Sequence, residues 1–386
     1  MPLIFPVIRF LYERGPRLAS SPEEAAALKY IENQLQVQGA DTSAVSFPSM
    51  TGSDWYYAFC YSLFPLATIL FLEEIWIALL VAFVGIMLLR LDLFIWPIVV
   101  RLFSGWSRSR TVYGRLSCSE ELRQTVVVTA NVDSRHVFPL LPLWPSLERV
   151  LPTLSVAFDY CRAIQFILML VALICNFFAM RAQVNMLWRC TWPIAIVYLF
   201  ACAMMLVQAM YGTTLQCAND NLSGLQVLEN LAAAFAEKPA EHTDVVLAAT
   251  GSGRAGMLGV YYFIQALRPK RDATFFLNIS AVGSGRVMMV GSEGYSRPLS
   301  ASEELTDWGY LAGSETPIPL EVTPIKQQRT DAAMARSLGY RAMTLTGVTP
   351  YQRPPLLVEE KAIEGVNILY TTDCIQRIIA TIDRGT

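Results

Sequence analysis

Long hydrophobic runs divide this chain into segments of contrasting pattern. The runs are Tyr56–Leu72, Ile75–Leu89, Ile164–Met180 and Pro193–Met210, and the second run continues as a mainly hydrophobic segment to Val100. A membrane-spanning helix needs about 20 predominantly apolar residues, and the first run is only slightly short of that length. We therefore predict two transmembrane helical hairpins, over residues 56–104 and 161–210.

Burial of these runs inside one large core is the alternative, but four runs of this length exceed what one domain of this size can bury. Each hairpin returns the chain to the side that it left. The segments 1–55, 105–160 and 211–386 would then form one discontinuous domain on one face of the membrane.

The distribution of basic residues suggests which face this is. Several arginines lie near the spans on the domain side: Arg101, Arg108, Arg110 and Arg162. Basic residues are enriched on the cytoplasmic side of membrane proteins, so this count favours a domain that faces the cytoplasm. The first ten residues lack a signal-peptide pattern, which points to the same side.

The remaining segments alternate between strand-like and helix-like patterns. Val126–Asn131 and Val245–Thr250 are β-branched strands, and apolar residues recur at helical spacing over Leu225–Phe235. Further strands are expected near residues 43–47, 273–279, 287–290, 320–323 and 341–345. Further helices are expected within residues 16–40, 258–267, 302–311, 330–339 and 359–382. This alternation predicts an α/β sandwich around a mixed sheet.

The octet Cys217–Gly224 is a tight polar loop that opens the helix after it. Asn221 or Ser223 has the side chain to cap the first turn of that helix. Asp220, just before the turn, is well placed for a metal ligand. An ordinary capping loop is the plainer interpretation of the octet alone.

Composition narrows the class of protein. The chain of 386 residues is 54% hydrophobic and 16% charged, whereas about a quarter of the residues are charged in ordinary soluble domains. The excess apolar surface must face lipid or a protein partner. The net charge of −2 gives no argument for nucleic acid. The eight cysteines form neither a disulfide framework nor a zinc-finger pattern.

The order of the polar motifs resembles a known family. Asp133-Ser134 ends the first strand, the octet opens a helix, and a glycine-rich turn over Gly251–Gly259 follows the second strand. This order, with the segment Gly15–Glu24, is similar to that of the co-catalytic zinc aminopeptidases. The family includes leucyl aminopeptidases, glutamate carboxypeptidases and the catalytically silent transferrin-receptor, nicastrin and nicalin branches. The resemblance implies a three-layer sandwich with a two-zinc site.

The resemblance also implies where the zinc ligands would lie, and most of those positions hold other residues. Asn131 replaces the first histidine ligand, and Ser280 replaces an aspartate ligand. The pair of glutamates that serve as general base and ligand aligns with Gly253 and Arg254. Asp133, which orients the histidine in the family, and the bridging Asp220 are retained. The loop that holds a late histidine ligand aligns with residues 349–355, which contain no histidine.

Two further features bear on the chemistry. His136, three residues beyond Asp133, is an outside candidate for a metal ligand, although packing in a loop is the plainer role. A guanidinium at Arg254 repels a divalent cation, and we expect it to pair with Asp220 or Asp133 in place of a metal. The run Gly251–Gly256 also has the spacing of a nucleotide-binding loop, but the preceding order of elements is wrong for a dinucleotide fold.

These observations predict a multi-pass membrane protein with a catalytically silent aminopeptidase-like domain. No catalytic residue, metal or cofactor is expected, and the domain would serve as a scaffold or would bind a peptide or a membrane-protein partner. The alternative is a membrane-bound aminopeptidase that holds zinc in a reduced site of Asp220, Asp133 and His136.

Overall fold

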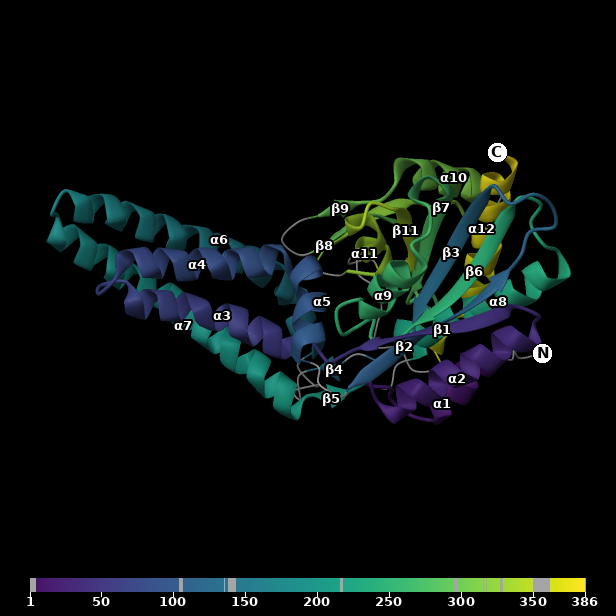
Figure 1. Cartoon of the computed structure of the whole chain (residues 1–386), viewed down its shortest axis with the longest axis horizontal. Coiled ribbons are helices and arrows are strands. Elements are labelled where there is room, and N and C mark those ends of the chain that lie inside the picture. Colours follow the sequence, from purple (N-terminus) through teal and green to yellow (C-terminus); the bar gives the residue numbers. More distant parts are fainter. Residues whose placement is uncertain are drawn as a thin grey trace. The chain divides into compact units, whose positions relative to one another are not determined.

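The computed structural model describes residues 5–103, 107–134, 136–137, 144–215, 218–294, 298–314, 316, 318–326, 329–349 and 362–385. The chain divides into two compact units (Figure 1). The α/β unit comprises Met1–Thr51, Val99–Arg135 and Thr214–Thr386, and the helical unit comprises Gly52–Ile98 and His136–Thr213. Both insertions therefore leave and rejoin the α/β unit along its sequence.

In the described residues of the helical unit, four helices form a bundle. They are α3 (Asp54–Leu70), α4 (Ile75–Arg90), α6 (Trp144–Phe177) and α7 (Arg181–Tyr211). α3 packs against α4 and α7, and α6 packs against α4 and α7. Small residues such as Ala67, Ala78 and Ala172 form part of the core where the helices meet. A short pair of strands, β4 (His136–Val137) and β5 (Thr213–Thr214), joins the ends of the second insertion.

Hydrogen bonds from buried and half-buried side chains also link these helices. Gln165 Nε2 of α6 donates to the Phe64 carbonyl at 2.8 Å and to Thr68 Oγ1 at 3.0 Å on α3. Trp188 Nε1 of α7 donates to the Thr68 carbonyl at 3.0 Å. In an apolar environment such bonds fix the register of neighbouring helices, because their loss leaves polar groups without partners.

Among the residues that the structure describes, two helical stretches are long and apolar enough, by length and composition, to cross a membrane. They are Tyr160–Phe177 of α6 and Arg181–Tyr211 of α7. The predicted span that starts at Ile75 is instead two helices, α4 and α5 (Asp92–Phe103), bent by 99° to one another. This pair reaches the length and hydropathy of a span only when both helices are counted together.

The second insertion also begins earlier than the hydrophobic run indicates. We expected residues 105–160 in the α/β domain, but His136 onwards belongs to the helical unit, and α6 already starts at Trp144. The sequence of the first turns of α6 is too polar to be recognised as part of a membrane-spanning segment. The hydropathy pattern therefore predicts the apolar part of this helix but not the residue at which it begins.

A mixed sheet forms the centre of the α/β unit. Its strands are β1 (Asp41–Pro48), β2 (Arg108–Leu116), β6 (Thr243–Thr250), β3 (Gln124–Asn131), β7 (Thr274–Ser280), β11 (Arg341–Val348), β8 (Arg286–Gly294) and β10 (Val322–Lys326), in spatial order. A short strand, β9 (Leu299–Ser300), pairs with β8. The central strands β6, β3, β7 and β11 run parallel, while β1, β2 and β8 each lie antiparallel to a neighbour.

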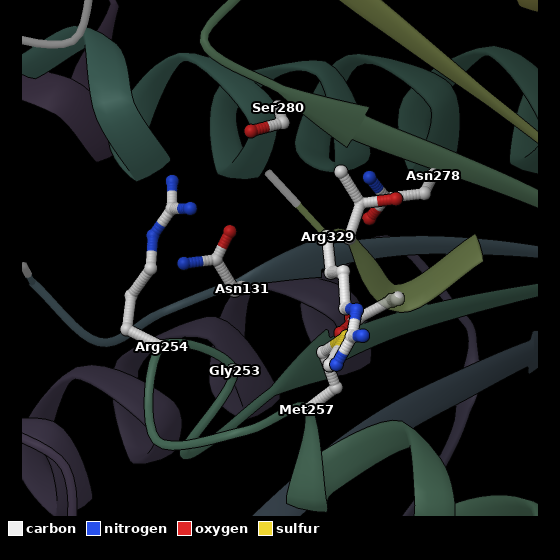
Figure 2. A pocket seen from close by; sticks show the side chains of 9 residues that line it. Asn131, Gly253, Arg254, Met257, Asn278, Ser280 and Arg329 are labelled. Carbon is white, nitrogen blue, oxygen red and sulfur yellow. The ribbon is translucent and has the colours of Figure 1, made fainter. Parts of the chain in front are cut away.

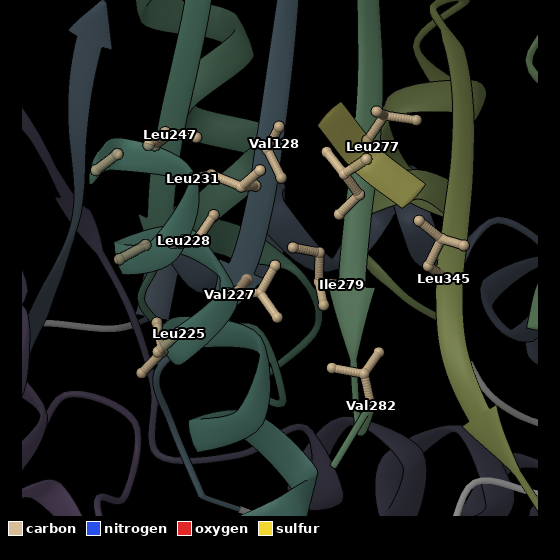
Figure 3. Packing of buried hydrophobic residues seen from close by; sticks show 14 of the residues in the cluster. Val128, Leu225, Val227, Leu228, Leu231, Leu247, Leu277, Ile279, Val282 and Leu345 are labelled. Atoms are coloured by element: carbon tan, nitrogen blue, oxygen red, sulfur yellow. The ribbon is translucent and has the colours of Figure 1, made fainter. Parts of the chain in front are cut away.

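Helices cover both faces of this sheet, so the predicted three-layer sandwich is confirmed. One face carries α1 (Pro6–Glu13), α2 (Pro22–Val37), α8 (Ser223–Glu237), α10 (Glu303–Ser314) and α12 (Gly365–Arg384). The other face carries α9 (Leu258–Leu267) and α11 (Asp331–Ser337). The main core lies on the first face, and its cluster includes Val128, Leu277 and Leu345 of three strands together with Leu228 and Leu231 of α8 (Figure 3).

Candidate functional site

The second face of the sheet is polar where its parallel strands end. Alternate residues of a strand point to opposite faces, so Thr129, Asn278 and Thr344 lie opposite the apolar core in adjacent strands. Thr129 Oγ1 donates to Asn278 Oδ1 at 3.1 Å, and Asn278 Nδ2 donates to Thr344 Oγ1 at 3.5 Å. A buried polar row of this kind has to satisfy its own hydrogen bonds. It forms the floor of the candidate site.

The octet is attached to this end of the sheet through its side chains. Asn221 Nδ2 donates to the Val132 carbonyl at 2.7 Å, and Asn221 Oδ1 accepts from Arg17 Nη2 at 3.1 Å. Ser223 Oγ donates to the Asn219 carbonyl at 2.8 Å and accepts from Val282 N at 3.1 Å. The prediction that Asn221 or Ser223 caps the helix is therefore wrong. A short π-helix over Ala218–Leu222 leads directly into α8 instead.

The glycine-rich turn after β6 binds carboxylates of its own chain. Ser252 N donates to Glu24 Oε1 at 2.7 Å. Gly253 N and Arg254 N donate to the two carboxylate oxygens of Asp133, each at 2.8 Å. Three successive backbone amides are thus occupied from within the α/β unit. These are the groups with which a nucleotide-binding loop would hold phosphate, so the nucleotide interpretation of Gly251–Gly256 is wrong.

Arg254 forms an ion pair with Asp220. Its Nη2 contacts Asp220 Oδ1 and also donates to the Asp220 carbonyl at 3.3 Å. The side chains are 15% and 2% exposed, respectively. The charge of Asp220, which the resemblance aligns with the bridging ligand, is therefore neutralised by a guanidinium in a largely dry environment. This is the pair that the sequence predicts when Arg254 replaces a metal ligand.

The remaining family positions lie beside this pair. Asn131 ends β3 and donates through Nδ2 to the Asp133 carbonyl at 3.3 Å. Ser280 ends the neighbouring strand β7, is 3% exposed, and its hydroxyl has no hydrogen-bond partner among the described residues. Figure 2 shows Arg254 beside Asn131, with Ser280 and Asn278 on the next strand. The structure thus brings together Asn131, Asp133, Asp220, Arg254 and Ser280.

His136 lies in the helical unit. Its Nε2 is 3.0 Å from the Gln208 carbonyl oxygen of α7. Gln208 Nε2 in turn donates to Asp54 Oδ1 at 3.0 Å. These contacts tie the imidazole to the foot of the helical bundle. Of the aligned loop 349–355, only Thr349 lies among the described residues.

The donors at the family positions do not fit a pair of zinc ions. Across the described part of the chain, no three His, Cys, Asp or Glu side chains gather closely enough to hold a metal. Zinc sites in proteins use histidine, cysteine and carboxylate donors. Here Asp220 is paired with Arg254, Asp133 accepts two amides, and the other positions supply an amide and a hydroxyl.

Two buried carboxylates near the site were not predicted from the sequence. Glu24 lies in the first turn of α2, is 1% exposed and also accepts from Ser109 Oγ at 2.8 Å. Asp331 opens α11, is 3% exposed and accepts from Thr250 Oγ1 at 2.6 Å. The spacing Ser21-x-x-Glu24, typical of a capping box, was the available signal that Glu24 turns back towards the chain.

Burial dominates the protonation of this cluster. Desolvation, followed by the nearby charge of Asp133, raises the pKa of Glu24 from 4.5 to about 7. Desolvation also raises the pKa of Asp133 to about 6, although the Arg254 amide and guanidinium oppose the shift. It raises the pKa of Asp331 to about 7. Three carboxyl groups around the site therefore exchange protons near neutral pH.

A small pocket opens over these residues. Its lining comprises Asn131, Gly253, Arg254, Met257, Asn278, Ser280, Arg329, Thr330 and Asp331 (Figure 2). Its enclosed volume is about 10 Å³, which is roughly the space that one water molecule needs. The pocket can therefore receive a single polar atom, such as one oxygen of a carbonyl or carboxylate group.

Comparison with known proteins gives the fold a context. Residues 207–363 match the sequence profile of Peptidase family M28. No curated protein matches the chain. Among solved structures, a leucine aminopeptidase precursor from Bacteroides thetaiotaomicron has a TM-score of 0.56 at 10% identity, covering 97% of this chain and 95% of that one.

Two further structures give the same picture. BSAP, a zinc aminopeptidase from Bacillus subtilis, has a TM-score of 0.56 at 11% identity and covers 98% of this chain and 94% of its own. A glutaminyl cyclase from Bacteroides thetaiotaomicron has a TM-score of 0.56 at 11% identity, with 97% and 96% covered. Identities this low show a shared fold and leave the activity open.

Proposed function

We propose that this chain, which has a zinc-aminopeptidase-like fold, is a multi-pass membrane protein whose α/β domain is catalytically silent. The domain acts as a scaffold or as a module that binds a peptide or a membrane-protein partner. The Arg254–Asp220 ion pair carries this proposal. It provides the counter-charge for the retained carboxylate that a divalent cation would otherwise supply.

Electrostatics opposes the replacement of the Arg254 guanidinium by a metal ion at Asp220. A metal at Asp220 would have to displace a guanidinium that is 15% exposed and leave it next to a dication. Separating a buried ion pair costs about 3–5 kcal/mol when one charge is left uncompensated. Asp133 is a poor substitute for Asp220 as a metal ligand, because both of its carboxylate oxygens already accept hydrogen bonds from the backbone amides of Gly253 and Arg254.

The position of the proton acceptor supports the same view. Hydrolysis by a metallopeptidase needs a general base that takes a proton from the attacking water. Gly253 has no side chain to do so, and a Cβ at this position would lie 2.6 Å from the Asn131 Cβ. The turn is therefore packed too closely for a glutamate at this position.

The pocket favours a ligand that accepts hydrogen bonds. Arg254 Nε and Ser280 Oγ are buried and have no partner among the described residues. Both belong to side chains that line the pocket, together with the Arg329 guanidinium. A carboxylate or carbonyl group of a peptide end would satisfy these donors. Because the pocket is small, the rest of such a ligand would lie outside it, on a partner protein.

The alternative, a membrane-bound zinc aminopeptidase with a reduced site, needs His136 beside Asp220 and Asp133. In the structure His136 is bonded to Gln208 within the helical unit. We therefore keep this alternative as the opposing outcome of the test.

The test uses the full chain, purified in detergent and supplied with excess zinc. Fluorogenic aminoacyl amides and short peptides are assayed for hydrolysis with and without a chelator, next to an active zinc aminopeptidase. The proposal predicts no chelator-sensitive hydrolysis and a peptide affinity that the chelator leaves unchanged. Chelator-sensitive release of N-terminal residues, lost in Asp220→Asn, would establish the enzyme instead.

A further inference from the structure

Helix α5 leaves the apolar helical bundle at a sharp angle. It follows α4 after a single residue, Leu91, and its axis is bent by 99° from that of α4. α4 is an apolar helix of 16 residues, which corresponds to a length of roughly 24 Å. If α4 runs through the bilayer, a bend of this size directs α5 along the plane of the membrane.

The surface of α5 is divided into a buried side and an exposed apolar side. Trp96 and Val100 are 4% and 0% exposed. Phe94, Ile98 and Leu102 are 46%, 55% and 72% exposed. Their spacing of four residues places these three side chains on one face of the helix. The following Phe103 is 74% exposed.

Exposure of this apolar face of α5 to water is energetically unfavourable. An exposed apolar patch of contiguous side chains usually marks a surface that binds lipid or protein. Basic side chains flank the patch, since Arg90 precedes the helix, Arg101 lies within its last turn, and Arg108 follows it. All three are exposed. Bulky apolar residues next to arginines are typical of helices that lie in the boundary between lipid headgroups and acyl chains.

We propose that α5 lies in the membrane interface, with Phe94, Ile98 and Leu102 inserted among the acyl chains and its arginines at lipid phosphates. The occupant of this face is thus a phospholipid surface. The argument for lipid rather than a protein partner is continuity, because α5 is joined through one residue to the apolar helix α4. The inference rests on the proposal that the helical unit is embedded in a membrane.

Depth-dependent quenching tests this placement in the full chain. A small fluorescent amino acid is incorporated by codon suppression at Ile98 or Leu102, and the protein is reconstituted into phosphatidylcholine–phosphatidylserine vesicles. The lipids carry bromine either near the headgroup end or near the tail end of the acyl chain. Ile167 of α6 and Leu311 of α10, with exposures of 56% and 58%, are matched controls for the bilayer core and for water.

We expect shallow bromines to quench positions 98 and 102 several-fold more strongly than deep bromines do. Position 167 should show the opposite order, and position 311 should not be quenched. Strongest quenching of 98 and 102 by deep bromines would mean that α5 crosses the bilayer, which overturns the proposal. Quenching at 167 but not at 98 and 102 would place α5 in water or against a protein. An unquenched position 167 would instead refute the membrane embedding of the helical unit.

Discussion

Replacing Arg254 by alanine should destabilise the α/β unit strongly. The substitution leaves the Asp220 carboxylate, 2% exposed, without the guanidinium that neutralises it. Removal of one partner from a buried ion pair costs about 3–5 kcal/mol. In a folded unit of this size, each kcal/mol lowers the melting midpoint by roughly 2–4 °C. The expected decrease is therefore about 6–20 °C.

The assay is thermal unfolding of the purified full chain in one detergent, at a fixed scan rate. Asp220→Asn removes the charge that needs compensation. Arg254→Ala should therefore cost much less in the Asp220→Asn background than in the parent, which gives a coupling energy between the two sites. Arg286→Ala is the matched control. It breaks an exposed ion pair with Glu321, with side chains 44% and 50% exposed, and such pairs contribute about 0–1 kcal/mol.

Two results would refute the reasoning. One is a midpoint of Arg254→Ala that is no lower than that of Arg286→Ala. The other is an equal cost of Arg254→Ala in the parent and in the Asp220→Asn background. Either outcome would mean that the guanidinium does not compensate the charge of Asp220.

Three more predictions follow from the cluster and the bundle. Because burial raises the pKa of Glu24 from 4.5 to about 7, the folded state holds this proton more tightly than the unfolded chain, and stability falls as the pH rises through that interval. The melting midpoint of Glu24→Gln should fall less than that of the parent over this window, and parallel curves would contradict the assignment. Gly253→Ala should cost about 1–3 kcal/mol through overpacking, since its Cβ would lie 2.6 Å from the Asn131 Cβ; an unchanged midpoint would show that the turn can relax. Gln165→Leu should lower the stability of the bundle by about 1 kcal/mol, measured by unfolding in detergent, and a stabilised variant would contradict the role of the hydrogen bonds to Phe64 and Thr68.

The strands around the site could be predicted because the local pattern of their side chains is enough to favour a strand over a helix. The β-branched run Val126–Val128 and the apolar segments of β6 and β7 cannot satisfy a helical pattern with a polar face. Helix α9 was located at Leu258–Leu267, between a glycine-rich turn and a basic, proline-containing end. Motif order then placed Asn131, Asp220, Arg254 and Ser280 together, because parallel strands bring their carboxyl ends to one edge.

Other features depend on partners that are distant in the sequence. Asn221 and Ser223 have the composition of helix caps, but the Val132 carbonyl and the Val282 amide compete successfully for their side chains. Glu24 turns inward because Ser109 and the Ser252 amide, from two other segments, surround its carboxylate. The bend between α4 and α5 is invisible to hydropathy, which remains high on both sides of Leu91.

The central claim is that a guanidinium takes the place of a metal cation at Asp220. The most direct measurement is the zinc content of the purified full chain after equilibration against a zinc buffer, with Asp220→Asn measured in parallel. We predict much less than one zinc per chain and no difference between the two proteins. One or two zinc ions per chain, lost in Asp220→Asn, would contradict the claim.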